Sequence, residues 1–295
     1  MSKHLVDNPN RPLSMPCEDV LALHDQSRSY ESFEEFRDDL PTLLQKGTLL
    51  EQCIEVTRAL GFVEPLSGRY MPPESIQILG SNYRESIIAN GLLSRNRGLL
   101  HTLEACYGTL EALEQLDIFF AESPSGMTDW LRKHLAKNRL ICSELVEKGQ
   151  SVDLEMLHQD LCSLTFPDAS FDLVLCNEIF EQVRDLDVAF KEIVRVLRPG
   201  GQLVATCPMA FGQRQSIIKA LPDPNGGAPV FLDIAERHGD PVDSGTVVYR
   251  IPGWELIEQL VVAGFCDASI QHISSWKHGI LGADLPGILV ITANR

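Results

Sequence analysis

Long apolar runs, basic residues and closely spaced cysteines are all scarce in this 295-residue sequence. No stretch of 18 apolar residues occurs, and the opening MSKHLVDNPNRPLS has no apolar signal core, so we expect neither a membrane span nor a secretory signal. Acidic residues outnumber basic ones by 41 to 25, which gives a net charge of −16. That charge disfavours nucleic acid and anionic membranes as partners, although a local basic groove would override the mean.

The eight cysteines are scattered and form no CxxC pair. Several lie within strand-like runs, where cysteine usually acts as a small buried apolar residue. We therefore expect a reduced, cytoplasmic protein with no zinc cluster and no bound metal. The composition, 44% apolar and 22% charged, is typical of a soluble globular chain with one large domain plus an appendage, or two modest domains.

What is present is a strong α/β pattern between residues 158 and 207. Residues 171–176 (FDLVLC) form a nearly continuous apolar run, which predicts a strand covered on both faces. Residues 188–197 have apolar positions at helical spacing, and the RPGG at 198–201 ends that helix. Residues 202–207 then return as another apolar strand. This order predicts the second half of a doubly wound parallel sheet.

The whole chain divides into two predicted parts, residues 1–115 and residues 116–295. The first is a mostly helical arm and cap: two helices in 30–62, with Ser32 and Glu35 as a capping box, and further helix in 74–115 interrupted near Gly91. In the second we expect further strands and helices between those already described. The strands are 117–122, 139–143, 154–159, 266–275 and 287–293, and the helices are 127–136 and 253–263.

The stretch "LTFPDASFDLVLCNEIFEQVRDLDVAFKEIVRVLRPGGQL" resembles the class I S-adenosylmethionine-dependent methyltransferases. The likeness is tight over about 117–207, looser over 208–295 and absent from 1–75. It implies a seven-stranded doubly wound sheet whose last strand is antiparallel, with S-adenosylmethionine as cofactor. Another kind of nucleotide-binding α/β domain is the alternative, but dehydrogenases carry their glycine signature at the first strand instead.

The resemblance assigns cofactor roles to residues that follow the strands. Glu144 would meet the ribose, Asp160 the adenine amino group with Leu161 beside it, and Asn177 the methionine part. The strand-one loop departs from the family pattern, since only Gly126 remains of its glycines; Glu122 keeps the acid position, and Ser123 supplies a small residue. Arg95 would reach the cofactor carboxylate, with Tyr83 and Arg84 as weaker candidates. Each of these residues also has an ordinary structural role open to it, as a turn cap or a solvated charge.

The substrate side is less defined. Residues 208–245 form a long Gly- and Pro-marked insertion, which we expect to be a substrate lid, and His238 near its end is a candidate general base. The candidate substrate contacts are Glu178, Tyr249, Trp276 and His278. Gln182 stands where relatives have histidine, so no imidazole acts there.

Two functions remain open on this reading. One is methylation of a small-molecule acceptor on oxygen or nitrogen, in secondary or sugar metabolism. The other is a non-catalytic methyltransferase-like binding or assembly domain. We keep a homodimer as a candidate assembly.

Overall fold

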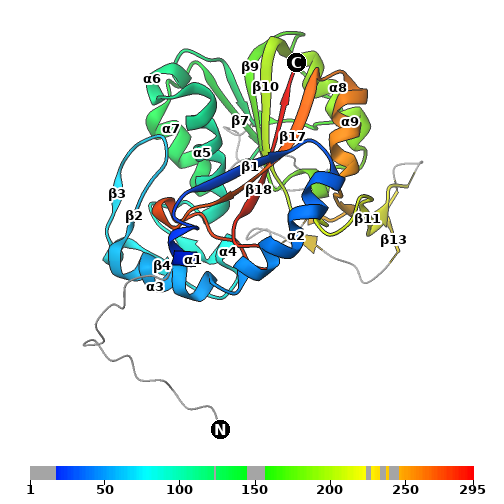
Figure 1. Cartoon of the computed structure of the whole chain (residues 1–295). Helices are drawn as coiled ribbons and strands as arrows, with labels where there is room; N and C mark the ends of the chain where they lie inside the picture. Colours follow the sequence, from blue (N-terminus) through cyan, green and yellow to red (C-terminus); the bar gives the residue numbers. More distant parts are fainter. Residues whose placement is uncertain (1–17, 123, 145–156, 224–226, 233–236, 239–245) are drawn as a thin grey trace.

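The computed structural model describes residues 18–122, 124–144, 157–223, 227–232, 237–238 and 246–295. Its centre is one eight-stranded sheet in the order β1-β17-β18-β10-β9-β6-β7-β8 (Figure 1). In that order the strands are β1 (Gln26–Tyr30), β17 (Asp267–Ser274), β18 (Ile288–Asn294), β10 (Leu197–Thr206), β9 (Phe171–Asn177), β6 (Ile118–Phe120), β7 (Leu140–Glu144) and β8 (Leu157–His158).

The five strands from β10 to β8 run parallel, and β18 is antiparallel to both of its neighbours. This confirms the predicted α/β sheet with an antiparallel last strand. The sheet also has one strand more than predicted, because β1 pairs antiparallel with β17. We had expected no strand before residue 117. The sequence of β1, QSRSY, is polar and exposed except at Tyr30, so it has no apolar alternation to detect.

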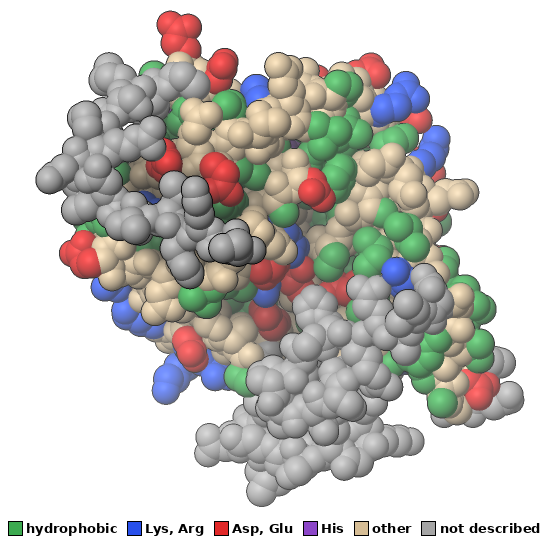
Figure 2. Space-filling view, turned by 90° about the horizontal axis from the view of Figure 1, so that it is seen from below, with side chains coloured by type: hydrophobic (Ala, Val, Ile, Leu, Met, Phe, Trp, Pro, Cys, Tyr) green, Lys and Arg blue, Asp and Glu red, His purple; other side chains and the backbone are tan. Residues whose placement is uncertain are grey.

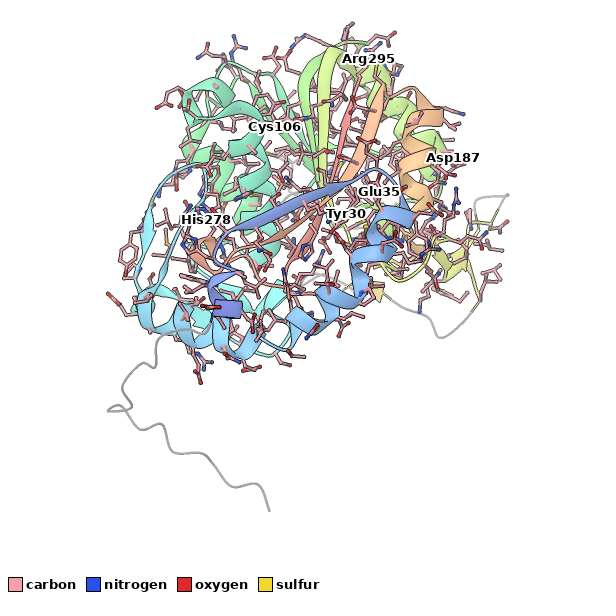
Figure 3. All side chains as sticks on the ribbon, viewed as in Figure 1. Tyr30, Glu35, Cys106, Asp187, His278 and Arg295 are labelled. Carbon is pink, nitrogen blue, oxygen red and sulfur yellow. The ribbon has the colours of Figure 1, made fainter. Side chains whose placement is uncertain are left out.

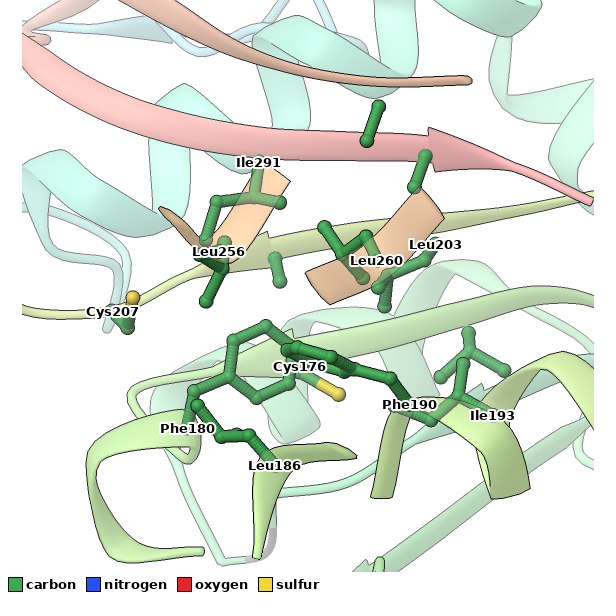
Figure 4. Close-up of a cluster of buried hydrophobic side chains, with 14 of the residues drawn as sticks. Cys176, Phe180, Leu186, Phe190, Ile193, Leu203, Cys207, Leu256, Leu260 and Ile291 are labelled. Atoms are coloured by element: carbon green, nitrogen blue, oxygen red, sulfur yellow. The ribbon is translucent and has the colours of Figure 1, made fainter. Parts of the chain in front are cut away.

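Helices cover both faces of the sheet (Figure 1). On one face lie α5 (Ser94–Tyr107), α6 (Leu110–Leu113) and α7 (Gly126–His134), and on the other α8 (Leu186–Val196) and α9 (Glu255–Ala263). Neighbouring strand residues divide between the two layers: Phe119 and Val174 join the cluster that contains α8 and α9, and Phe120 and Leu175 join the opposite one. Figure 4 shows the first cluster, where Phe180 and Phe190 pack near Leu256 and Leu260. The central strands are therefore apolar throughout because both faces are buried.

The N-terminal region lies below the carboxyl ends of the parallel strands (Figure 1). Its elements are α1 (Glu18–Leu21), α2 (Phe33–Gly47), α3 (Leu50–Leu60), β2 (Phe62–Val63), β3 (Tyr70–Met71), η1 (Pro73–Ser75), β4 (Gln77–Ile78), α4 (Tyr83–Ser86) and β5 (Ile87–Ile88). The Ser32 hydroxyl accepts from the Glu35 amide at 3.3 Å and caps α2 as predicted. The region has a small core of its own, which includes Leu23, Ile54 and Phe62.

The described part of the predicted lid consists of short paired strands. They are β11 (Ile217–Ile218) with β16 (Arg250–Ile251), β12 (Ala220–Leu221) with β13 (Val230–Phe231), and β14 (Arg237–His238) with β15 (Thr246–Val247). Two short 3-10 helices complete the described elements, η2 (Phe180–Gln182) and η3 (Trp276–His278). No helix in the described ranges is long and apolar enough to cross a membrane.

Arg97 joins the N-terminal region to the core. Its side chain is fully buried in α5 and donates to the carbonyls of Ile87, Leu92 and Gly279 at 2.8–3.1 Å. The guanidinium also lies 4.6 Å from the centre of the Phe62 ring. Burial lowers the pKa of Arg97 to about 9, so it is still charged at neutral pH. One cation thus ties three segments that are far apart in the sequence.

We expect Arg97→Met to lower the free energy of unfolding by about 2–4 kcal/mol, because three buried carbonyls lose their donors. Urea unfolding measures the change. Arg58→Met, on the exposed side of α3, should shift stability by less than about 0.5 kcal/mol. Equal, small effects of the two substitutions would contradict this role for Arg97.

Candidate functional site

Polar side chains meet at the carboxyl ends of β6, β9 and β10. Glu122 follows β6, Asn177 ends β9 and Thr206 ends β10. The Asn177 amide donates to Glu122 Oε2 at 2.8 Å, and the Thr206 hydroxyl donates to Asn177 Oδ1 at 2.6 Å. Burial raises the pKa of Glu122, against the lowering effect of its bond from Asn177. The two predicted residues Glu122 and Asn177 therefore lie together, at the edge where open α/β sheets bind ligands.

Glu178 is the most constrained residue of this edge. It is buried, and its φ of 55° places a non-glycine residue in the left-handed region. Such strain is concentrated at functional sites, where the surrounding structure holds it in place. Arg84 of α4 forms an ion pair with Glu178 Oε1. Glu178 Oε2 is also buried, yet no described residue bonds to it. Burial acts to raise the pKa of Glu178, but Arg84 and Arg95 outweigh it and lower that pKa, so the group is a carboxylate.

The two arginines come from the N-terminal side. Arg84 pairs with both Glu85 and Glu178, and Arg95, at the start of α5, donates from Nε to Glu85 Oε2 at 2.8 Å. Nη1 of Arg95 is buried and has no hydrogen-bond partner among the described residues. Seen from below, acidic and basic side chains gather near the middle of this face (Figure 2). The site thus offers a free donor on Arg95 and a free acceptor on Glu178.

An α-amino acid group is the chemistry that suits this pair. Its carboxylate would take the unused N–H of Arg95, and its ammonium would take the unused Oε2 of Glu178. Both atoms are buried, so leaving them without partners costs free energy that such a ligand would recover. The residues present therefore fit the methionine end of the cofactor that the sequence resemblance implies.

Glu181, in η2, is a third carboxyl at this edge and was not predicted. It is fully buried, and its carbonyl accepts from the Tyr249 amide at 2.8 Å. Burial and the nearby charge of Glu178 raise the pKa of Glu181 to about 8. Glu181 is therefore mostly protonated at neutral pH, beside Glu178, whose pKa is lowered. The contact also brings Tyr249, a predicted substrate residue, to the site.

The ribose and adenine candidates lie further along the same edge. Glu144 ends β7 as predicted, although only its backbone is among the described residues. Asp160 accepts from the Cys162 amide at 2.8 Å and forms an ion pair with Arg184 at 2.6 Å. Asp160 is thus a turn cap, and a ligand amine would share its carboxylate with Arg184. Leu161 is buried in the core beside it.

The strand-one loop is packed against protein. Ser125 caps α7 by accepting from the Thr128 amide at 3.1 Å, and Ser123 lies outside the described residues. A Cβ on Gly126 would lie 1.9 Å from the carbonyl oxygen of Gly91. Glycine is therefore needed here because two backbones touch. Gly126→Val would therefore disturb the packing of the Gly91 turn as well as any ligand contact of the loop.

Trp276 and His278, two further candidate substrate residues, contact the N-terminal region, and Figure 3 shows His278 on that side of the molecule. Trp276 donates to the Val20 carbonyl at 2.8 Å, and its ring packs on His24. His278 contacts Val63 and Asp25. His238 lies in β14, opposite Thr246, and its side chain is outside the described part.

The resemblance to methyltransferases predicted the positions of Glu122, Asn177 and Glu178 because each lies at or just after the end of a strand. It missed Glu181, although the EQV stretch was noted, and it ranked Arg84 low. A buried carboxylate such as that of Glu178 needs a cation. This requirement indicates that some arginine or lysine must pair with it, and it is the one clue by which Arg84 could have been found. Its partner is 94 residues away in the chain.

Comparison with known proteins agrees with this geometry. Residues 125–205 match the family described as a methyltransferase domain. A demethylmenaquinone methyltransferase from Bacillus velezensis is 33% identical over 118 residues, which cover 39% of this chain and 49% of that protein. One from Listeria welshimeri is 33% identical over 106 residues, covering 35% and 42%. The chain thus spans about half the length of the curated relatives it matches.

Solved structures give more distant likenesses. An S-adenosylmethionine-dependent methyltransferase from Mesorhizobium loti is 20% identical with a TM-score of 0.41, covering 63% of this chain and 95% of that one. A Burkholderia thailandensis 1,6-didemethyltoxoflavin-N1-methyltransferase with bound S-adenosylhomocysteine is 18% identical with a TM-score of 0.39, covering 68% and 77%.

The raised pKa of Glu181 makes stability depend on pH. The folded chain keeps this proton up to about pH 8, whereas an unfolded carboxyl loses it near its ordinary value of 4.5. Stability from this group is full below about pH 4.5 and is lost as pH rises to 8. We expect Glu181→Gln to remove that loss, so the variant gains on the parent between pH 5 and pH 8 in urea unfolding. Parallel pH curves would contradict it, and the exposed Glu114→Gln should follow the parent.

Proposed function

We propose that this chain, whose core is a class I S-adenosylmethionine-dependent methyltransferase domain, transfers a methyl group to a small-molecule acceptor. The observation that carries the proposal is the pair of buried unused atoms, Arg95 Nη1 and Glu178 Oε2, at the carboxyl edge of the sheet. They match the two charged groups of a bound amino acid. The matched family covers residues 125–205, which include Asn177 and Glu178 of this edge.

S-adenosylmethionine supplies an activated methyl group on a sulfonium, so the protein has mainly to position it and to remove a proton from the acceptor. Arg95 and Glu178 would hold the amino acid end, Glu144 the ribose and Asp160 the adenine. The Glu122–Asn177–Thr206 chain would keep Glu178 and its neighbours in register. When bound, the cofactor would supply its methyl group to the acceptor atom, and the electron pair of the carbon–sulfur bond would stay on sulfur. A base would take the acceptor proton.

The acceptor would lie between the carboxyl edge and the lid, near Glu181 and Tyr249. The curated relatives named above are demethylmenaquinone methyltransferases. Hydroxylated rings of the quinol type therefore join amino- and hydroxyl-bearing metabolites as candidate acceptors.

A non-catalytic binding domain is the second candidate. It is favoured by the strand-one loop, where Gly126 touches the Gly91 backbone and the other usual glycines are missing. A domain of this kind would show no turnover with any acceptor. It would also bind S-adenosylhomocysteine weakly or not at all.

Calorimetric titration with S-adenosylmethionine and S-adenosylhomocysteine tests the assignment. Glu144→Ala removes the acceptor for two ribose hydroxyls and should weaken binding by roughly 1.5–3 kcal/mol, about ten- to a hundred-fold. Arg95→Gln should cause a similar loss because the ligand carboxylate loses a charged donor. Arg37→Gln, an exposed arginine on α2, is the matched control and should bind as the parent does. If neither Glu144→Ala nor Arg95→Gln changes affinity, the cofactor assignment is wrong.

Release of S-adenosylhomocysteine over the acceptor panel tests catalysis. If His238 is the general base, His238→Ala should lower turnover about 10²–10⁴-fold with cofactor affinity nearly unchanged. The parent should also lose activity as pH falls below neutrality, because a protonated imidazole cannot accept a proton. Full activity of the variant would leave positioning alone as the contribution of the protein.

A further inference from the structure

Away from this edge, three metal-ligating side chains converge from separate elements. Asp25 precedes β1, His101 lies in α5 and His278 ends η3. One ligand atom from each lies within 4.8 Å of the other two. His101 Nε2 is 3.4 Å from Asp25 Oδ1, and His278 Nε2 is 3.7 Å from Asp25 Oδ2. We propose that these three residues bind a divalent transition-metal ion of the zinc type.

The spacing suits a shared ion better than direct hydrogen bonds. An N–H···O bond usually measures about 2.7–3.2 Å, and both nitrogen–oxygen distances are longer. Zinc bonds to nitrogen and oxygen are about 2.0–2.2 Å, so two ligands of a tetrahedral ion lie about 3.3–3.6 Å apart. Small side-chain shifts bring all three donors into that range.

The hydrogen bond of His278 also orients its ring for metal binding. The contact between His278 Nδ1 and the Val63 carbonyl, 2.7 Å, requires the proton on Nδ1 and leaves the Nε2 lone pair facing Asp25. This is the outer-shell bond that orients most metal-ligating histidines.

Lys277 supplies the positive charge beside Asp25 that a bound metal ion would otherwise provide. Its ammonium lies 2.9 Å from Asp25 Oδ2, and its side chain is 41% exposed. An exposed lysine can turn into solvent when a cation arrives, so it is a competitor that the metal displaces. Asp25 also lines an open cleft of about 450 Å³ beside Arg28, Lys46 and His272. Of the three proposed ligands, Asp25 is the one that lines this cleft, so an ion would have access to its carboxylate from that side.

A bound ion would fasten the N-terminal region to the core. Its ligands belong to the segment before β1, to α5 and to the turn after β17. Helix α5 also carries Arg95 and Arg97 within two turns of His101. The metal would therefore stabilise the position of the helix that supplies arginines to the carboxyl edge.

Titration of the chelator-treated full chain with Co²⁺ and Zn²⁺ tests the proposal. We expect one ion per chain, a visible cobalt spectrum typical of nitrogen and oxygen ligands, and a raised melting temperature with Zn²⁺. Asp25→Asn and His278→Gln should each weaken binding by more than about ten-fold. His134→Gln is the control: this histidine contacts Trp130 of its own helix and is not one of the three proposed ligands, so the variant should bind metal as the parent does.

Lys277→Gln separates a metal site from a simple ion-pair cluster. Removing the competing ammonium should tighten Co²⁺ binding several-fold, even if the two ligand variants fold poorly. A parent that binds no ion, a sulfur-type cobalt spectrum, or affinity unchanged in Asp25→Asn, His278→Gln and Lys277→Gln would overturn the proposal.

Discussion

The structure depends on a negative charge held where water is excluded. Glu178 directly follows the central strand β9, in a strained backbone conformation and buried, and Arg84 of the N-terminal region forms an ion pair with it. Breaking a buried pair of this kind usually costs several kcal/mol, because the remaining charge has no water to turn to. The N-terminal region therefore completes the site. Without Arg84 and Arg95, the carboxyl edge would hold the buried Glu178 and Glu181 and the partly buried Glu122, with no cation from that side.

This arrangement explains why neighbouring carboxyls behave differently. Glu178 has two arginines and stays ionised, so Glu181, which is next to that charge, keeps its proton. Neutral and ionised carboxyls side by side provide both a hydrogen-bond donor and an acceptor in one small volume. The carboxyl edge can therefore bind both hydrogen-bond donors and hydrogen-bond acceptors of a ligand without changing its net charge.

The sequence predicted those features that are encoded by neighbouring residues. The apolar run 171–176, the helical spacing of 188–197 and the Ser32 cap all depend on contacts within a few positions, and they lie where expected. It could not predict β1, whose polar residues form a strand only because β17 offers an unpaired edge. The contact of Gly126 with Gly91 and the pair Arg84–Glu178 join distant segments, so no local pattern reports them.

The pairing of β1 with β17 sets the order in which the sheet can be completed. Gln26 lies opposite Ser274, and Tyr30 lies opposite Ile270. The first described strand therefore pairs with the last strand but one. During synthesis the ribosome delivers β1 long before its partner exists. The β1 segment therefore stays unpaired until the C-terminal strands have been synthesised. Pairing two strands so far apart in the sequence is intrinsically slow, because a long loop must close. The polar composition of β1, with four of its five residues exposed, keeps that waiting strand from pairing with other chains.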